Sequence, residues 1–275
     1  MHKPWFTVEY VHPRIVAIAE FHHFEKVVSY LVLGHKKAML IDTGMGYAPI
    51  GVIIRRITRA PIRVLLTHTH WDHIGGVHEF DSISVFDHPI ETELLYRGFW
   101  SEQIPELMDA ACFDKGWSPK KYRSLGVSQF STFRDGDVFE CAPFSLSVVH
   151  TPGHTPGSVC FIINEIDILI SGDTLYPGPL YAQLPESNSA AYAASIAKLA
   201  ARKKSFAKIL PGHNATSSDV HLLQDSYDLF QRIMRNKANV CKRGEGECEV
   251  FGKNMSVLMP RSAFEAGKGV ENRSK

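Results

Sequence analysis

The stretch at residues 64–76, VLLTHTHWDHIGG, limits what this 275-residue chain can fold into more than any other part. Its apolar start, Val64-Leu65-Leu66, predicts a buried strand. Four metal-ligand side chains follow within six positions: His68, His70, Asp72 and His73. Because residues i and i+2 share one face of a strand, His68 and His70 point the same way if the strand geometry continues past Leu66. Gly75-Gly76 then allows a tight bend.

Four crowded ligands that face different ways are too many for one tetrahedral site with an open position. They therefore predict two adjacent metal sites, of which this segment supplies only some of the ligands. Three later turns, each after a predicted strand, supply the rest: His154 in TPGHTPGS, Asp173 in SGD and His213 in PGH. Ligands at strand ends can converge on one edge of a sheet. Seven candidates match two metals, and Asp173, alone on its loop, is the natural bridging ligand. Imidazole and carboxylate donors without a thiolate suit zinc, or iron, manganese or cobalt.

The remaining pattern of strands and helices is typical of an α/β chain. We expect residues 1–240 to form the main domain and residues 241–275 a C-terminal hairpin and frayed tail. Residues 174–187 are interpreted as a long loop. Apolar side chains are spread irregularly over residues 91–130. They fit either ordinary helical packing or a cap over the site, and a cap would favour a substrate with an apolar part.

Composition argues against several classes of protein. Thirty Lys and Arg against 29 Asp and Glu leave a formal charge of +1, which does not favour nucleic acid as a partner. Five Cys without a C-x-x-C motif do not indicate a disulfide framework. No apolar run is long enough for a membrane span or typical of a signal peptide. The default expectation is a cytoplasmic enzyme for a small-molecule substrate, with a homodimer left open.

The motifs HTHWDH, TPGHTPGS, SGD and PGH, in this order and spacing, resemble those of the metallo-β-lactamase fold superfamily. The resemblance runs from about Val27 to His213 and implies a four-layer αββα sandwich with a dimetal site at one edge of its sheets. It implies a first metal bound by His68, His70 and His154, a second bound by Asp72, His73 and His213, and Asp173 as the bridge. Asp42 in the IDTG stretch resembles a residue that orients a ligand; its alternative role is a simple turn Asp.

Departures from the family pattern indicate the branch. Common β-lactamases have a Cys near the position of Asp173, and the flavin-linked diiron branch has an acid in place of His70. The resemblance therefore implies the glyoxalase II, acyl-thioesterase and lactonase branches. We expect a two-metal, zinc-type hydrolase that cleaves a thioester, lactone or carboxylic ester with a metal-bridging hydroxide. Asp72 would pass a proton to the leaving group. Tyr176, at the offset of a Tyr in acyl-homoserine-lactone lactonases, would donate a hydrogen bond to the oxyanion.

Two other functions remain as alternatives. Sulfur dioxygenases of this superfamily have a similar motif but use one iron and O₂, and the complete second ligand set, notably His213, argues against them. A metal-bearing binding module without catalysis is the other alternative. Metal analysis and a screen of ester, thioester and lactone hydrolysis distinguish the three.

Overall fold

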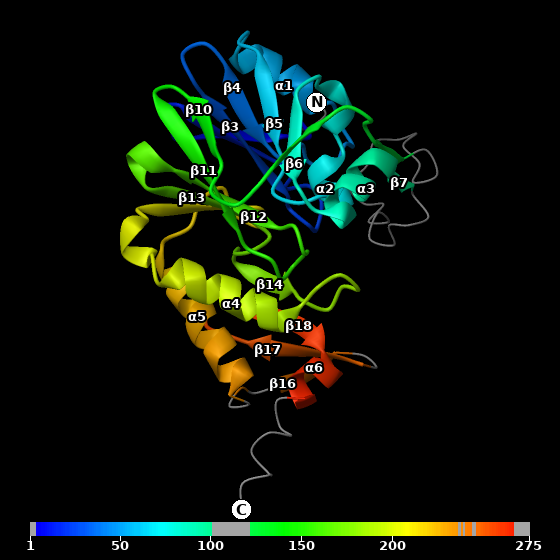
Figure 1. Cartoon of the computed structure of the whole chain (residues 1–275), viewed down its shortest axis with the longest axis vertical. Coiled ribbons are helices and arrows are strands. Elements are labelled where there is room, and N and C mark those ends of the chain that lie inside the picture. Colours follow the sequence, from blue (N-terminus) through cyan, green and yellow to red (C-terminus); the bar gives the residue numbers. More distant parts are fainter. Residues whose placement is uncertain (1–3, 101–121, 236–237, 239, 244–245, 267–275) are drawn as a thin grey trace, which may run out of the picture.

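The computed structural model describes residues 4–100, 122–235, 238, 240–243 and 246–266. Two β-sheets face each other in the middle of the molecule, with helices on their outer sides (Figure 1). Much of the predicted cap at residues 91–130 lies outside the described residues.

The first sheet has seven strands in the order β1-β2-β3-β4-β5-β6-β9. Strands β1 to β4 are antiparallel neighbours, whereas β4, β5, β6 and β9 run parallel. The bounds are β1 Thr7–His12, β2 Ile15–Ala19, β3 Val28–Leu33, β4 Ala38–Ile41, β5 Ile62–Leu65, β6 Ile83–Phe86 and β9 Ser131–Phe133. Parallel pairing places the carboxyl ends of β4 and β5 at the same edge of the sheet.

The second sheet has five strands in the order β10-β11-β12-β13-β15. Its last pair, β13 and β15, is parallel, and the other pairs are antiparallel. The bounds are β10 Val138–Cys141, β11 Phe144–His150, β12 Val159–Ile163, β13 Ile168–Gly172 and β15 Lys208–Pro211. The carboxyl ends of β13 and β15 therefore also lie together.

Alternating side chains of β12 show how the layers are packed. Val159, Phe161 and Ile163 belong to the buried cluster between the two sheets. Cys160 and Ile162 point the other way, into the cluster that the sheet shares with two helices. Both faces of the strand are buried, so it has a continuous apolar run instead of an alternating pattern. A helix layer thus covers each sheet, and the predicted αββα sandwich is confirmed.

The helices lie on the outer faces of the sheets (Figure 1). Helices α1, α2 and α3 contribute to the cluster on the first sheet, and α4 and α5 to the cluster on the second. The bounds are α1 Ile50–Ile57, α2 Trp71–Ile74, α3 Pro89–Arg97, α4 Ser189–Ala200, α5 His221–Met234 and α6 Arg261–Ala266. Short 3₁₀ helices among the described residues are η1 Val77–Glu79, η6 Asn164–Ile166 and η7 Lys203–Ser205. The Asn188 side chain caps α4 by accepting a hydrogen bond from the Ala191 N–H.

A third sheet, in the order β14-β18-β17-β16, joins the C-terminal hairpin to the middle of the chain. Its bounds are β14 Gly178–Tyr181, β16 Val240–Arg243, β17 Glu247–Phe251 and β18 Met255–Pro260. Strands β17 and β18 pair as an antiparallel hairpin. The interpretation of 174–187 as a loop throughout is wrong, because β14 pairs in parallel with β18. Gly and Pro are rare in strands, so only the distant partner reveals this one. The boundary at residue 240 stays a prediction.

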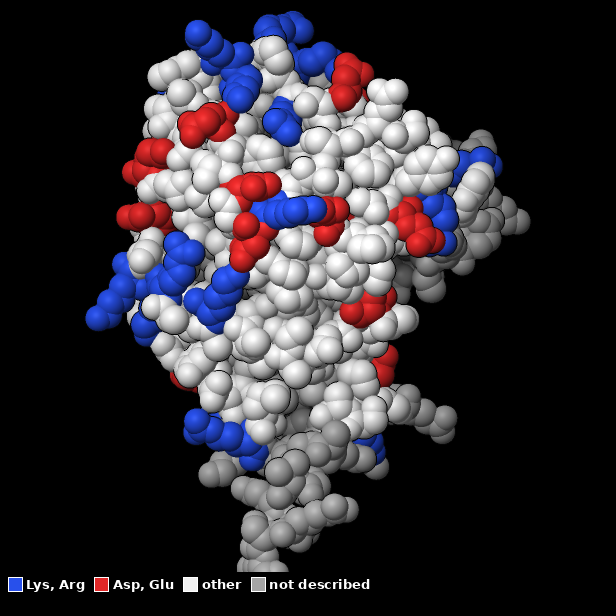
Figure 2. Space-filling view, viewed as in Figure 1, with Lys and Arg blue, Asp and Glu red and all other residues white. Residues whose placement is uncertain are grey.

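A small ribbon of β7 Gly98–Trp100 and β8 Arg123–Leu125 also lies in the region that the sequence left irregular. None of the helices that the structure describes is both long and apolar enough to cross a membrane. In Figure 2, cationic and anionic side chains are interspersed over the face shown, and neither sign covers it alone.

Candidate metal centre

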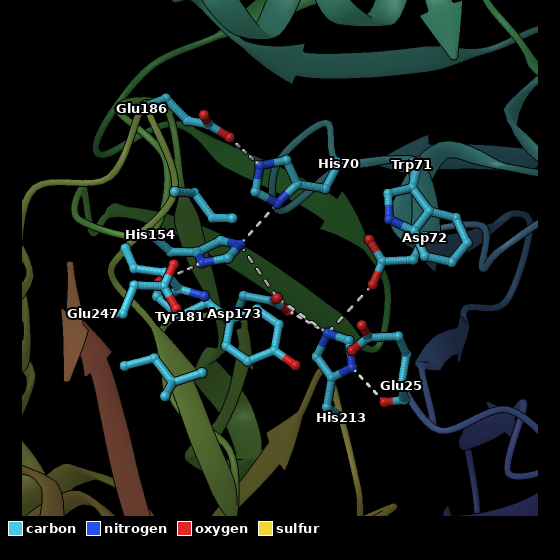
Figure 3. A pocket seen from close by; sticks show the side chains of 13 residues that line it. Glu25, His70, Trp71, Asp72, His154, Asp173, Tyr181, Glu186, His213 and Glu247 are labelled. Carbon is cyan, nitrogen blue, oxygen red and sulfur yellow. Dashed lines mark hydrogen bonds and ion pairs between the residues drawn. The ribbon is translucent and has the colours of Figure 1, made fainter. Parts of the chain in front are cut away.

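The seven predicted ligands come together where β4, β5, β13 and β15 end, although they are spread from His68 to His213 in the chain. His68 and His70 lie in the loop after β5, and Asp72 and His73 belong to the short helix α2 instead of a simple turn. Three groups of donor atoms each lie within 4.8 Å of one another: His68, His70 and His154; His68, His73 and Asp173; Asp72, His73 and His213. Figure 3 shows the side chains of His70, Asp72, His154, Asp173 and His213 directed at a common centre.

In the first group, three imidazole nitrogens face one another. His70 Nδ1 lies 3.1 Å from His68 Nε2 and 2.9 Å from His154 Nε2. Four tetrahedral ligands about 2.05 Å from a zinc ion would be separated by about 3.3 Å. The observed spacing is close to that value.

The opposite ring nitrogens show that these three imidazoles offer lone pairs to the centre. His154 Nδ1 donates to the Tyr181 carbonyl at 2.9 Å, and His70 Nε2 donates to Glu186 Oε1 at 2.6 Å. His68 Nδ1 lies 3.1 Å from Thr67 Oγ1, which itself donates to a carboxylate and so accepts from His68. When one nitrogen of a neutral imidazole donates, the other is an acceptor. Three acceptors at these distances repel one another unless a cation lies between them.

The donor group of Asp72, His73 and His213, called the second group from here on, is oriented in the same way. His73 Nδ1 contacts Asp42 Oδ2 at 2.9 Å, and His213 Nδ1 donates to the Glu25 carbonyl at 2.7 Å. Their Nε2 atoms lie 3.3 Å apart, and each is 3.6 Å from Asp72 Oδ2. Asp42 therefore orients a predicted ligand, as expected from the sequence. It also receives the Thr67 hydroxyl at 2.7 Å and so reaches the first group indirectly.

Asp173 lies between the two groups. Its Oδ1 is 3.1 Å from His73 Nε2 and 3.0 Å from His213 Nε2, and its Oδ2 is 3.4 Å from His154 Nε2. The buried Oδ1 accepts no hydrogen bond from the residues that the structure describes. A buried carboxylate oxygen that faces acceptor nitrogens needs a positive charge. The donor set therefore suits divalent metal ions, with Asp173 placed to serve both groups.

A glycine explains how two of these loops approach so closely. A Cβ at Gly212 would lie 2.8 Å from Asp173 Oδ1, so a larger residue there would displace the carboxylate. Gly75 acts similarly, and not through the free bend that the sequence suggested. Its φ of −57° is ordinary, but a Cβ there would lie 2.1 Å from the Met45 carbonyl carbon. Glycine is therefore needed at both positions because neighbouring atoms pack too closely for a side chain, and not because the backbone needs extra conformational freedom.

Charge differs between the two groups. Burial, together with the neighbouring imidazole of His70, lowers the pKa of His154 to about 4, although Asp173 opposes the shift. Burial also lowers the pKa of His213, but the charge and hydrogen bond of Asp173 outweigh it and raise the value to about 9. Burial would raise the pKa of Asp173, whereas His213, His73 and His68 hold it well below its usual range. The second group thus attracts positive charge more strongly.

A cavity of about 470 Å³ opens over the centre, within the range of about 300–1,000 Å³ usual for ligand pockets. Its described lining has five carboxylates and no Lys or Arg. The carboxylates are Glu25, Asp72, Asp173, Glu186 and Glu247. Sequence reasoning missed Glu186, which follows no motif, and Glu247, which reaches the cavity only because its hairpin joins β14.

The two predicted catalytic residues lie in different surroundings. Asp72 lines the cavity beside the second group. Tyr176 packs against His213, with 4.9 Å between ring centroids, and its hydroxyl donates to the Pro179 carbonyl at 2.6 Å. Tyr181, the last residue of β14, lines the cavity and is drawn in Figure 3. The role of Tyr176 stays a prediction.

A buried carboxylate ties two of the ligand loops together. Glu91, in the first turn of α3, is fully buried and accepts the hydroxyls of Thr69 at 2.6 Å and Thr155 at 2.5 Å. The Gly157 N–H also donates to it at 3.0 Å. Thr69 lies between two histidines of the first group, and Thr155 follows the third in sequence. Glu91 therefore holds in place the loops that form this group.

The fold and donor set define a metal-dependent enzyme of known architecture. The family model described as the metallo-beta-lactamase superfamily matches residues 24–240, and the chain belongs to this superfamily. The resemblance inferred from the motifs is thereby confirmed.

Similar proteins include the acyl-coenzyme A thioesterase MBLAC2 of Homo sapiens, 31% identical over 78% of this chain and 80% of that protein. The probable metallo-hydrolase YqgX of Bacillus subtilis is 29% identical over 54% of this chain and 66% of its own length. Among solved structures, a metallo-beta-lactamase from Pontibacter korlensis superposes with a TM-score of 0.63 at 18% identity, over 82% of this chain and 99% of that one. The chain is a metal-dependent hydrolase of this fold.

Proposed function

We propose that the protein binds two divalent metal ions, zinc in the first instance, and hydrolyses an ester-type bond to a carbonyl carbon, with a thioester as the preferred substrate. The observation that carries the proposal is the pair of donor groups with Asp173 between them. The second group is as complete as the first, which supports two ions over the single iron of a dioxygenase. Bound ions would polarise a carbonyl and lower the pKa of a water molecule.

The residues of the chain would do the rest. Asp72 faces the cavity and could accept and return a proton at the leaving group. A donor role for Tyr176 would require its hydroxyl to exchange the Pro179 carbonyl for the substrate. Replacing Tyr176 by Phe tests this role, and unchanged kcat and KM would remove the residue from the mechanism.

Thioesters are placed first because of the relatives and the cavity. Three relatives named as acyl-coenzyme A thioesterases share 31% identity with this chain. Three lining carboxylates, Glu25, Glu186 and Glu247, lie outside the predicted ligand set and disfavour phosphates. The cavity therefore suits the acyl and thioester part of such a substrate, while the nucleotide stays outside. A lactone or a carboxylic ester has the same carbonyl chemistry and serves as the comparison.

The test is a hydrolysis panel on the metal-loaded protein. Acyl-CoAs, S-acylglutathiones, S-acyl-N-acetylcysteamines, lactones and carboxylic esters are compared, with thiol release or acid formation as the signal and Asp173→Ala as the inactive control. We expect thioesters to have the highest kcat/KM. Lactone opening without thiol release would contradict the thioester assignment. One iron per chain with O₂ consumption would overturn hydrolysis altogether, and bound metal without turnover of any substrate would point to a binding module.

A further inference from the structure

A second hollow adjoins the metal centre and differs from it in chemistry. It has a volume of about 410 Å³ and is lined by Ile90, Leu94, Phe99, Pro185, His70 and Glu186. The first four side chains are apolar and come from α3, β7 and the loop after β14. None of the described lining residues is a Lys or Arg. Such a surface suits an uncharged aliphatic group.

The hollow adjoins the cavity over the metal centre, and two residues line both spaces. His70 and Glu186 belong to the cavity over the metal centre and also to this groove. Their side chains are joined by the 2.6 Å contact between His70 Nε2 and Glu186 Oε1, so they form the boundary between the two spaces. In Figure 3, this pair lies at the side of the first donor group. A substrate with its carbonyl at the centre can extend its chain past this pair.

The wall of the groove is held rigidly to the metal loops. Ile90 and Leu94 lie on either side of Glu91 on α3, and the buried Glu91 carboxylate bonds Thr69 and Thr155. The distance from the apolar wall to the first donor group is therefore determined by buried hydrogen bonds. A wall fixed in this way lowers the entropy lost when a flexible chain is ordered against it.

We infer that the groove lined by Ile90, Leu94, Phe99 and Pro185 binds the acyl chain of the substrate and sets its chain-length preference. The inference rests on the proposed function and adds the part of the substrate that the metal centre does not recognise. The groove takes an aliphatic chain, because four of its six described lining residues are apolar. Each methylene that enters it should raise kcat/KM by about fourfold, the equivalent of about 0.8 kcal/mol.

The experiment uses S-acyl-N-acetylcysteamine thioesters with acyl chains from two to twelve carbons, because they lack the phosphates of CoA. For the wild type, we expect kcat/KM to rise with chain length. Leu94→Trp fills the groove and should lower kcat/KM for the longest chains by about tenfold or more, and lower it much less for the two-carbon substrate. Glu93→Trp, at an exposed position of the same helix, is the matched control. Leu94→Ala, which removes part of the wall, should also weaken the response to length.

A binding measurement separates this inference from the proposed function. Calorimetry with a non-hydrolysable decyl thioether of N-acetylcysteamine should show binding to the wild type and to Glu93→Trp, and about tenfold weaker binding to Leu94→Trp. If thioesters are hydrolysed but Leu94→Trp has the same chain-length dependence and the same affinity as the wild type, the groove assignment is overturned and the proposed function stands. If no thioester is hydrolysed but binding depends on Leu94, the groove stands and the proposed function fails.

Discussion

The two donor groups of the metal centre differ in charge and in access. His68, His70 and His154 are all imidazoles, and the His70 side chain is 13% exposed toward the cavity and the groove. In the other group, Asp72 adds a carboxylate and His73 is fully buried against Asp42. Both groups reach the cavity, but only the first also borders the apolar groove, through His70. The second group contains a carboxylate ligand and has its most buried imidazole, His73, held by Asp42. Within one site, one side borders the groove and the other binds a cation more firmly.

The largest effect is expected when the residue shared by both groups is removed. Asp173→Ala should empty the second group and weaken the first, because Asp173 contributes to both sets of contacts. The loss in metal affinity should exceed the roughly 10–100-fold typical of an outer partner. Metal content after dialysis, measured by elemental analysis, checks this. Two retained ions per chain would show that Asp173 is not shared.

Asp42→Asn should weaken the second group more than the first. Asp42 contacts the His73 ring directly but reaches His68 only through the Thr67 hydroxyl. An amide NH₂ in place of Oδ2 would face the N–H of His73, so the hydrogen bond would be lost. We expect a loss of about 10–100-fold in affinity for one of two ions in a chelator competition titration. Asp87→Asn, whose carboxylate pairs with Arg134 at the surface, is the control. Equal weakening of both binding steps would contradict the difference between the groups.

Glu91→Gln should have the opposite selectivity. The Glu91 carboxylate links the loops that carry the first group. The metal affinity of the first group should therefore fall, while that of the second is unchanged. The free energy of unfolding should fall by about 1.5–3 kcal/mol, since a buried hydrogen bond to a charged group is lost. Denaturant unfolding and the same chelator titration measure the two effects. Glu93→Gln on the exposed side of α3 should change neither, and a matching change there would remove the special role of Glu91.

The smallest effect on metal binding is expected for a buried acid near the second group, which acts on the stability of the fold instead. Burial raises the pKa of Glu20 from 4.5 to about 8, although hydrogen bonds from Met45 and Trp5 lower it. Between these values the folded chain keeps a proton that the unfolded chain loses, so stability falls as pH rises, by about 1.4 kcal/mol per pH unit.

Glu20→Gln, which cannot ionise, should remove this fall. Urea unfolding in EDTA at pH 5 and pH 8 measures it, with the exposed Glu140→Gln as control. The variant should lose less stability than the wild type between the two pH values. An equal loss of stability in the wild type and the variant between pH 5 and pH 8 would show that Glu20 ionises normally in the folded chain.

Much of the site could be predicted because its parts are local in sequence. His68 to His73 form one short segment after a buried strand, and His154, Asp173 and His213 each follow a strand or its turn. The residues missed have no such signal. Glu186 lies in an ordinary loop, and Glu91 looks like a common helix residue until its buried contacts with two other loops are known.

By itself, the sequence determined the class of fold and predicted seven candidate metal ligands in four separate segments, because strand patterns and ligand types can be recognised in short segments. Only the tertiary structure decided what surrounds them. The pairing of β14 with β18 brings Glu247 to the cavity, and the packing of α3 places Leu94 beside His70. Such contacts join residues far apart in the chain, and their energy depends on packing that no local pattern records.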